Sequence, residues 1–327
     1  MLLRTFHNNS IPAFVLIPLM ILGFWMRFFF TDMVHITALD NPSMPLWDSI
    51  IYPYLGQSQF TSGLTTFLLA LLIGWSLSRM VSQYGLLSKQ SMLPLLLYGL
   101  FTSVFLSVQR LNPVWFFVLF LALGIERLFS GTGSRKPMAI CFDAGFLAGI
   151  GSLFYAKGLF FFPILIITMG ILRLASFRSI VAAILGVLFP FAISITWFFL
   201  HDKSIEFLLL LKENLITNPG QYNHNIFSQM YMSVIIIFLG LSIIATFSYM
   251  PMQKVIVRRY LRVFVWILLL TGATVLTPFF SMEMIPLAAA GSAVTMAFWL
   301  DKMRKNRMKE MIFLLLIVVT ISAQLFL

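Results

Sequence analysis

The amino-acid sequence predicts an all-α fold, a polytopic bundle of about eleven transmembrane helices that forms one integral membrane domain over residues 1–327. Hydrophobic residues make up 60% of the chain and charged residues only 10%, whereas a soluble domain carries about 25% charged residues. Apolar runs of about 20 residues recur along the whole chain, and each is long enough to cross about 30 Å of hydrocarbon. Because every peptide group in lipid must be hydrogen-bonded within the protein, we expect these runs to be helices.

The predicted spans follow one another with short connections that leave no room for a separate soluble domain. Their approximate ranges are 11–30, 60–80, 91–109, 113–130, 139–156, 158–175, 179–200, 227–249, 260–280, 284–300 and 310–327. Only Lys157 and Gly158 separate two of them, so 139–175 is either two spans or one re-entrant hairpin. A basic segment precedes the first run and no small-residue cleavage site follows it, so we expect a signal anchor that serves as the first span.

The distribution of basic residues indicates the topology. Seventeen of the 22 Lys and Arg fall in one set of alternate loops, and the other set holds only five, namely Arg27, Arg110, Lys157, Lys203 and Lys212. Since loops rich in Lys and Arg stay in the cytoplasm, this predicts a cytoplasmic N-terminus and a C-terminus on the outer side of the membrane. The net charge of +11 is spread over these short loops, which argues against nucleic acid as a partner.

Two residues within the apolar runs have structural explanations. Asp143 lies inside a span, where an acid is a functional candidate because its burial is costly. It is also near the inner loop, and we favour an ion pair with Arg135 or Lys136. Cys141 is the single cysteine, which excludes an internal disulfide and a cysteine-based metal cluster.

The loop 31–59 is the main functional candidate, because it holds Asp32, Asp40 and Asp48 but no Lys or Arg. A carboxylate at a membrane–water boundary can act as a general base or bind a cation. We predict Asp32 and Asp40 as catalytic candidates and Asp48 as a substrate-binding one; the alternative is a solvated loop with ordinary surface acids. Residues 46–55 and 207–211 predict two short interfacial helices that frame a lateral cleft.

Three basic residues on the outer side are candidates for holding a lipid phosphate, namely Lys157, Arg110 and Arg27. Arg27 and Arg110 could instead pair with an acid of an outer loop, and a further alternative for all three is that the side chain extends to the interface and has no other role.

The second long outer loop, 201–226, supplies His201 and Tyr222 as candidates for hydrogen bonding to a sugar or headgroup, unless the loop is simply solvated. His201 and His224 do not have the spacing of a metal site, so we predict no metal and no cofactor. The span interiors hold almost no ionisable groups, which argues against an ion-coupled transporter.

Two stretches resemble the GT-C superfamily of polyprenyl-phosphate-sugar-dependent glycosyltransferases. In 42–75, Met44-Pro45-Leu46 and then Gly56-Gln57-Ser58 stand where that superfamily has its Pro-Pro-Leu element and the glycine before the second span. In 144–200, a glycine-rich span, a Lys-Gly turn and a Gly-x-x-x-Pro span follow in the same order. Most of the chain also resembles an uncharacterised family of polytopic inner-membrane proteins from Bacteroidota, a domain of unknown function. That likeness is carried by Leu111-Asn112-Pro113, by the run from Asp143 to Tyr155, and by Gly186 with Pro190.

The GT-C resemblance implies glycosyl transfer from a polyprenyl-phosphate-linked sugar at the periplasmic face, with Asp40 or Asp32 as the base. It also implies membrane lipids, including a polyprenyl phosphate, as partners. The alternative is a non-catalytic scaffold or lipid-binding subunit of an envelope-biogenesis complex, with envelope proteins as partners. Transport is the third and weakest hypothesis.

Overall fold

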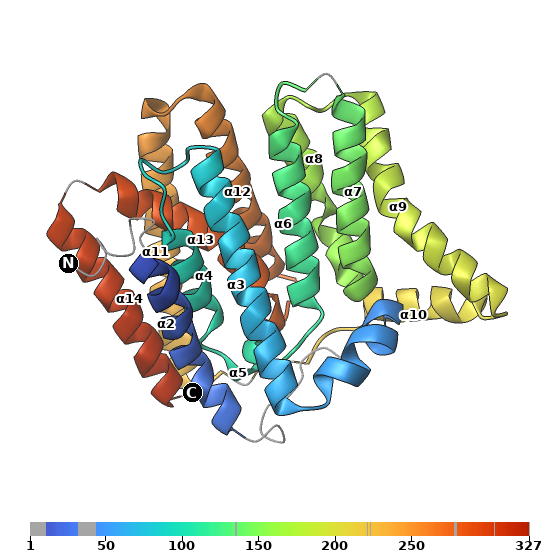
Figure 1. The fold of residues 1–327 in the computed structure, drawn as a ribbon, viewed down its shortest axis with the longest axis horizontal. Coiled ribbons are helices and arrows are strands. Elements are labelled where there is room, and N and C mark those ends of the chain that lie inside the picture. Colours follow the sequence, from blue (N-terminus) through green and yellow to red (C-terminus); the bar gives the residue numbers. More distant parts are fainter. Residues whose placement is uncertain are drawn as a thin grey trace.

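The computed structural model describes residues 11–31, 44–134, 136–220, 222, 224–277, 280–303 and 305–326. Helices dominate, and the described part of the chain contains no strand (Figure 1). The helical segments are α2 (Ile11–Phe30), η2 (Trp47–Gly56), α3 (Gln59–Gln83), α4 (Leu93–Thr102), α5 (Leu106–Gln109), α6 (Val114–Ser130), α7 (Pro137–Phe154), η3 (Ala156–Phe161), α8 (Phe162–Leu172), α9 (Phe177–Leu200), α10 (Ser204–Ile216), α11 (Ile226–Tyr249), η4 (Met250–Met252), α12 (Val255–Thr274), η5 (Met282–Met284), α13 (Ile285–Lys302) and α14 (Asn306–Phe326).

Seven of the described helices are long and apolar enough to cross a membrane, so the chain is a multi-pass membrane protein. They are α2, α3, α7, α9, α11, α13 and α14. The other four predicted spans also contain helices. However, α4 and α8 have only 10 and 11 residues, and α12 begins with a cluster of arginines. The count of eleven spans therefore stays a prediction.

Two predicted spans differ from continuous helices. The span predicted for 91–109 is interrupted at 103–105, where α4 ends and the one-turn helix α5 follows. The segment 139–175 consists of two helices, α7 and α8, joined by the 3₁₀ turn η3 that contains Lys157. The polar and glycine residues at these breaks interrupt apolar runs that hydropathy alone would join.

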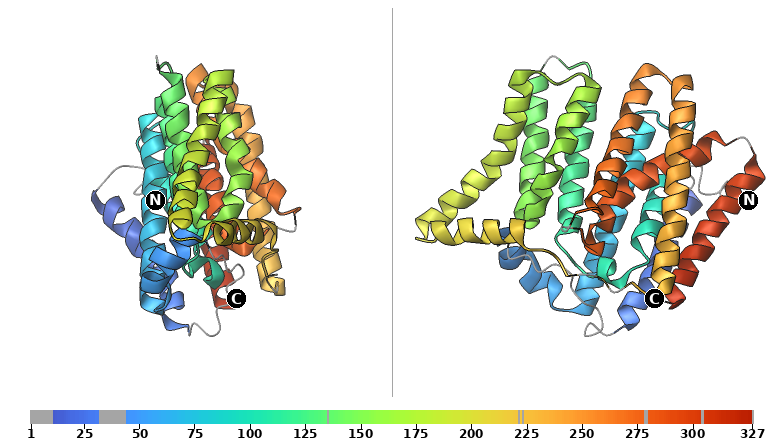
Figure 2. Two further views of the ribbon diagram at one scale, coloured as in Figure 1. Left: turned by 90° about the vertical axis from the view of Figure 1, so that its right-hand side faces the viewer. Right: turned by 180° about the vertical axis from the view of Figure 1, so that it is seen from behind.

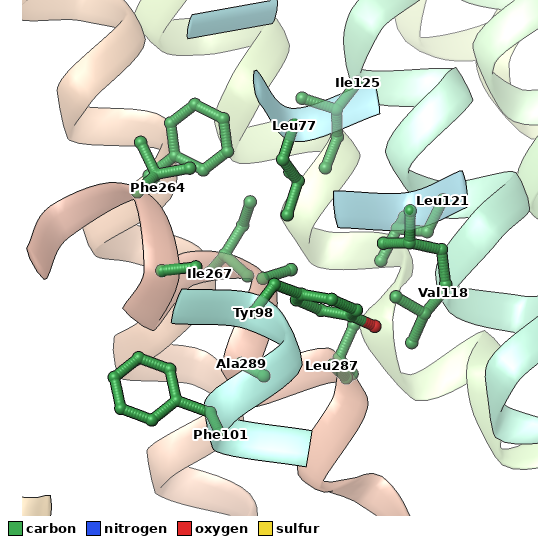
Figure 3. Close-up of a cluster of buried hydrophobic side chains, with 14 of the residues drawn as sticks. Leu77, Tyr98, Phe101, Val118, Leu121, Ile125, Phe264, Ile267, Leu287 and Ala289 are labelled. Carbon is green, nitrogen blue, oxygen red and sulfur yellow. The ribbon is translucent and has the colours of Figure 1, made fainter. Parts of the chain in front are cut away.

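The centre of the bundle is an apolar cluster contributed by α3, α4, α6, α12 and α13 (Figure 3). Leu77, Tyr98, Phe264 and Leu287 are all almost fully buried in it. Most of α13 is buried, and its run of alanines, a glycine and a serine allows neighbouring helices to approach closely.

The helices α7 and α9 pack at very short distance because glycines line their contact. A Cβ atom placed on Gly149 would lie 2.6 Å from the carbonyl oxygen of Val187, and one on Gly145 or Gly186 would overlap a backbone carbonyl of the facing helix. The glycine-rich span and the Gly-x-x-x-Pro span identified in the sequence are thus the two sides of one small-residue helix contact.

The loops after α6, α8 and α11 lie at one end of the bundle, the upper end in Figure 1. We call this the basic end, because its loops and the adjoining helix ends carry most of the described Lys and Arg residues. We call the opposite end the distal end. Near the basic end, Arg127 pairs with Asp143, with Nε and a terminal nitrogen 2.9 and 2.8 Å from one carboxylate oxygen. The partner of Asp143 among the described residues is thus Arg127 and not Lys136, while the other predicted partner, Arg135, lies outside the described residues. The sequence indicated only basic residues of the loop near Asp143 as partners. The packing of α6 against α7 instead brings Arg127, a residue of α6, to this carboxylate.

Both predicted short helices form at the distal end. Helix α10 lies across the direction of its neighbours, and α9 leans away from the bundle to meet it (Figure 2). The other segment, η2, is a π-helix that leads into the start of α3. Phe207 of α10 is fully buried, while Ile205, Leu208 and Leu209 are exposed, as expected for a helix that lies at an apolar boundary.

Candidate functional site

Two predicted site residues, Arg27 and Tyr222, come together at the distal end although they are far apart in the sequence. Arg27, in the last turn of α2, donates a hydrogen bond to the backbone carbonyl of Gln324 in α14. Burial raises the pKa of the Tyr222 phenol above its ordinary value, and the nearby Arg27 guanidinium partly opposes this shift. The Tyr222 ring lies 5.6 Å from the ring of Phe105 and 5.1 Å from the imidazole of His224. A guanidinium and an imidazole thus lie close to the Tyr222 phenol.

Beside this group lies a cleft of about 440 Å³ between α11, α12 and α13, within the range of about 300–1,000 Å³ typical of ligand sites. It is lined by Phe101, His224, Gln229, Tyr231, Met232, Ser233, Ile235, Ile236, Leu239, Leu268, Thr271, Gly272, Val275, Phe280, Met282, Ile285, Ala288, Ala289 and Ser292. The lining uses the first half of α11, the end of α12 and the start of α13, so the cleft occupies the distal half of the bundle. In the right-hand view of Figure 2, α11 is on the face toward the viewer.

The wall of the cleft is more apolar than its residue types suggest. The hydroxyls of Ser233, Thr271 and Ser292 donate to backbone carbonyls of their own helices, at 2.8 Å in each case. These groups therefore offer little to a polar ligand. Tyr231 has Thr320 as a hydrogen-bond partner, and Nδ1 of His224 lies 2.9 Å from the Ser228 hydroxyl. Among the described lining residues, the polar groups left for a ligand are Nε2 of His224 and the amide of Gln229, both around the beginning of α11. The cleft is therefore an apolar groove whose available polar groups lie at its distal rim.

A compact hydrogen-bond network supports this end of the bundle. The Gln109 amide donates to the carbonyls of Phe24 and Ser103, and the Gln324 amide donates to the same two carbonyls. The hydroxyl of Thr66 lies 2.6 Å from the Gln109 carbonyl oxygen. The bonds to the Ser103 and Gln109 carbonyls satisfy backbone groups at the break and at the end of α5, as a membrane interior requires.

Two charged residues of opposite sign are buried at the distal end. Lys157, in η3, is 2% exposed, and Glu283, in η5, is 1% exposed. The alternative that Lys157 extends to the interface is therefore wrong, because its side chain is enclosed by the protein. The sequence did not single out Glu283 as a candidate. Its burial has no sequence signal, since it depends on the 3₁₀ turn that precedes α13.

The remaining candidates lie elsewhere. His201 follows the end of α9, at the corner with α10, and Figure 1 shows this corner on the opposite side of the bundle from α2 and α14. Asp48 is an exposed residue at the start of η2, and Arg110 follows α5 in an extended conformation. Asp32 and Asp40 lie outside the described residues. The structure thus brings together two of the predicted substrate-binding residues, Arg27 and Tyr222, and adds His224 and Gln229 to them.

Within the described ranges, no three His, Cys, Asp or Glu side chains are grouped so that they could hold a metal ion. Comparison with protein-family models, with curated proteins and with solved structures finds no match for this chain.

Proposed function

We propose that the protein binds a polyprenyl-phosphate lipid at the distal end and uses it in a GT-C-like glycosyl transfer. The observation that supports this is the apolar cleft between α11, α12 and α13, whose rim at His224 lies next to Tyr222 and, through it, Arg27. An isoprenoid chain suits the apolar wall, and a phosphate suits the guanidinium.

The proposed reaction uses a carboxylate of the loop 31–59. Asp40 or Asp32 would take the proton of the acceptor hydroxyl, whose oxygen forms a bond to the anomeric carbon of the lipid-linked sugar. The bond between that carbon and the phosphate oxygen breaks, and the polyprenyl phosphate leaves with its electron pair. Arg27, beside Tyr222 at the rim, would stabilise the phosphate. Roles for Arg110 and Lys157 stay predictions, since neither is among the described residues that line the cleft. The distal end would then face the periplasm of a bacterial inner membrane.

A second candidate function is that of a non-catalytic lipid-binding subunit or scaffold for envelope proteins. The observation that favours it is the composition of the cleft, because none of the described residues that line it carries a carboxylate. Such a cleft can hold a lipid chain without providing an acid or base for chemistry.

One pair of measurements tests both functions. Lipids that copurify with the protein are identified by mass spectrometry, and Asp32→Asn/Asp40→Asn cells are compared with wild type for envelope glycans. A bound polyprenyl phosphate and altered glycans support the transferase. A bound polyprenyl phosphate with unchanged glycans supports the binding subunit, and the absence of any polyprenyl lipid argues against both.

A further inference from the structure

Two cavities adjoin one another on the face of the molecule opposite the distal cleft. One, of about 290 Å³, is lined by apolar residues of α2, α3 and α4, including Phe14, Leu72 and Leu95. The other, of about 270 Å³, lies at the basic end of α3 and is lined by Ser78, Arg79, Ser82, Gln83, Gln90 and Ser91. Trp75 and Met92 line both cavities, so the apolar one continues directly into the polar one.

One stripe of α3 forms the floor of both cavities and changes character along its length. Leu68, Leu72, Trp75, Arg79 and Gln83 are exposed and recur at helical spacing. The stripe runs from leucines through a tryptophan to an arginine and a glutamine, over roughly 22 Å at 1.5 Å per residue. This is the order that a phospholipid presents from its acyl chain to its headgroup, with the indole at the depth where such rings settle.

The polar cavity is rich in hydrogen-bond donors. A terminal nitrogen of Arg79 donates to Glu126, and among the described residues this guanidinium makes no further hydrogen bond. The side chains of Ser82 and Gln83 likewise make none to the described part of the protein. A guanidinium retains several N–H donors after one contact, and a phosphodiester accepts such donors on two oxygens.

The segment between α3 and α4, which forms part of the lining of the polar cavity, is held in place by hydrogen bonds to Asp301 in the last turn of α13. A carboxylate oxygen of Asp301 accepts from the backbone and side chain of Ser88, at 3.0 and 2.7 Å. These bonds fix the segment between α3 and α4, which carries Gln90, Ser91 and Met92. The site is therefore largely formed before a ligand arrives.

From these observations we infer that the groove between α2, α3 and α4 binds a glycerophospholipid of the leaflet at the basic end, with its phosphodiester at Arg79 and Ser82 and one acyl chain along Leu72 and Leu68. This site is separate from the distal cleft and does not depend on the function proposed for it. A lipid bound here would belong to the leaflet at the basic end, and not to the leaflet at the end that carries the distal cleft.

Native mass spectrometry of the full chain in detergent, titrated with phosphatidylglycerol, tests the site. Arg79→Gln removes the charge, and Ser82→Glu places a carboxylate in the donor cavity while it leaves the Arg79–Glu126 pair intact. Each variant is expected to weaken the tightest lipid-binding step by about tenfold or more, as for the loss of a charge-assisted hydrogen bond. Arg178→Gln, an exposed arginine at the basic end outside the groove, is the matched control and is expected to bind like wild type.

Unchanged lipid binding in both variants, or an equal loss in Arg178→Gln, would overturn the assignment. A competition arm separates a lipid site from a simple anion site. Glycerophosphoglycerol, which has the headgroup but no acyl chains, is expected not to displace the lipid at equal concentration. Displacement by this soluble compound would show an anion pocket and would also overturn the phospholipid assignment.

Discussion

Gln109 and Gln324 donate hydrogen bonds to the same two backbone carbonyls, those of Phe24 and Ser103. Gln109 follows the break in the predicted span 91–109 and Gln324 is near the end of α14, so the shared acceptors connect α2, α4, α5 and α14. The Ser103 carbonyl is one of those that a helix end leaves without a partner. In a membrane interior such a group must find a donor.

This arrangement predicts a non-additive effect on stability. We expect Gln109→Leu and Gln324→Leu each to lower the free energy of unfolding by about 1 kcal/mol, because the second glutamine still serves Ser103. The double variant is expected to lose more than the sum of the two, since only then is the carbonyl without either donor. Thermal unfolding in detergent measures this, with Gln57→Leu as the exposed control. Strict additivity would contradict the shared-acceptor arrangement.

The contact of α7 with α9 gives a second prediction. Gly145→Val is expected to destabilise the protein by about 3 kcal/mol or more, because the new side chain meets the backbone carbonyl of Ala183, which cannot move away as a side chain can. Gly170→Val in α8 is the control, since a Cβ there meets no atom within 4 Å. The melting temperatures of the two variants provide the comparison. A Gly145 variant as stable as the Gly170 variant would show that the helices are not packed this closely.

The sequence predicted most helices of this fold because long apolar runs determine them directly. It did not predict the interruption at 103–105, because Ser103 and Gln109 are short polar features within a run whose mean hydropathy stays high. Their partners Phe24 and Gln324 lie in distant helices. Only the tertiary arrangement shows that the break is stabilised.

The candidate site was predictable only in part, for a similar reason. The sequence could identify Arg27 and Tyr222 as polar residues in outer segments, but not that they meet beside Phe105. It gave two alternatives for Lys157, and the packing of η3 decides against exposure. Gln229 lies at the start of an apolar span and carried no signal, because its place at the rim follows from how α11 faces α12 and α13.

The distal cleft provides a third prediction. Gly272 lines it, and a Cβ on this residue meets no atom within 4 Å. A tryptophan there would extend into the cleft without a backbone clash, so Gly272→Trp is expected to lose the copurifying lipid while the protein stays folded. Gly170→Trp, at an equally open glycine of α8, is expected to retain it. Lipid extraction and mass spectrometry measure the difference, and equal lipid content in the two variants would exclude this cleft as the chain-binding site.

The fourth prediction concerns which end faces the periplasm, on which the proposed transfer reaction depends. Cys141 is the single cysteine and is fully buried, so the natural chain gives little background with a thiol reagent. Ser134 and Thr217 are both exposed hydroxyl residues, the first in the loop after α6 at the basic end and the second directly after α10 at the distal end. A membrane-impermeant maleimide, applied to cells whose outer membrane alone is permeabilised, is expected to label Thr217→Cys.

In the same cells Ser134→Cys is expected to react only after the inner membrane is disrupted, because the excess of Lys and Arg retains its loop in the cytoplasm. The opposite labelling pattern would place the loop 31–59, Asp32 and Asp40 included, on the side where a periplasmic acceptor could not reach it. Labelling of both variants from outside would mean that the two ends of the bundle do not lie on opposite sides of the membrane. Either result would end the proposal of a periplasmic glycosyl transfer, whatever lipid the cleft holds.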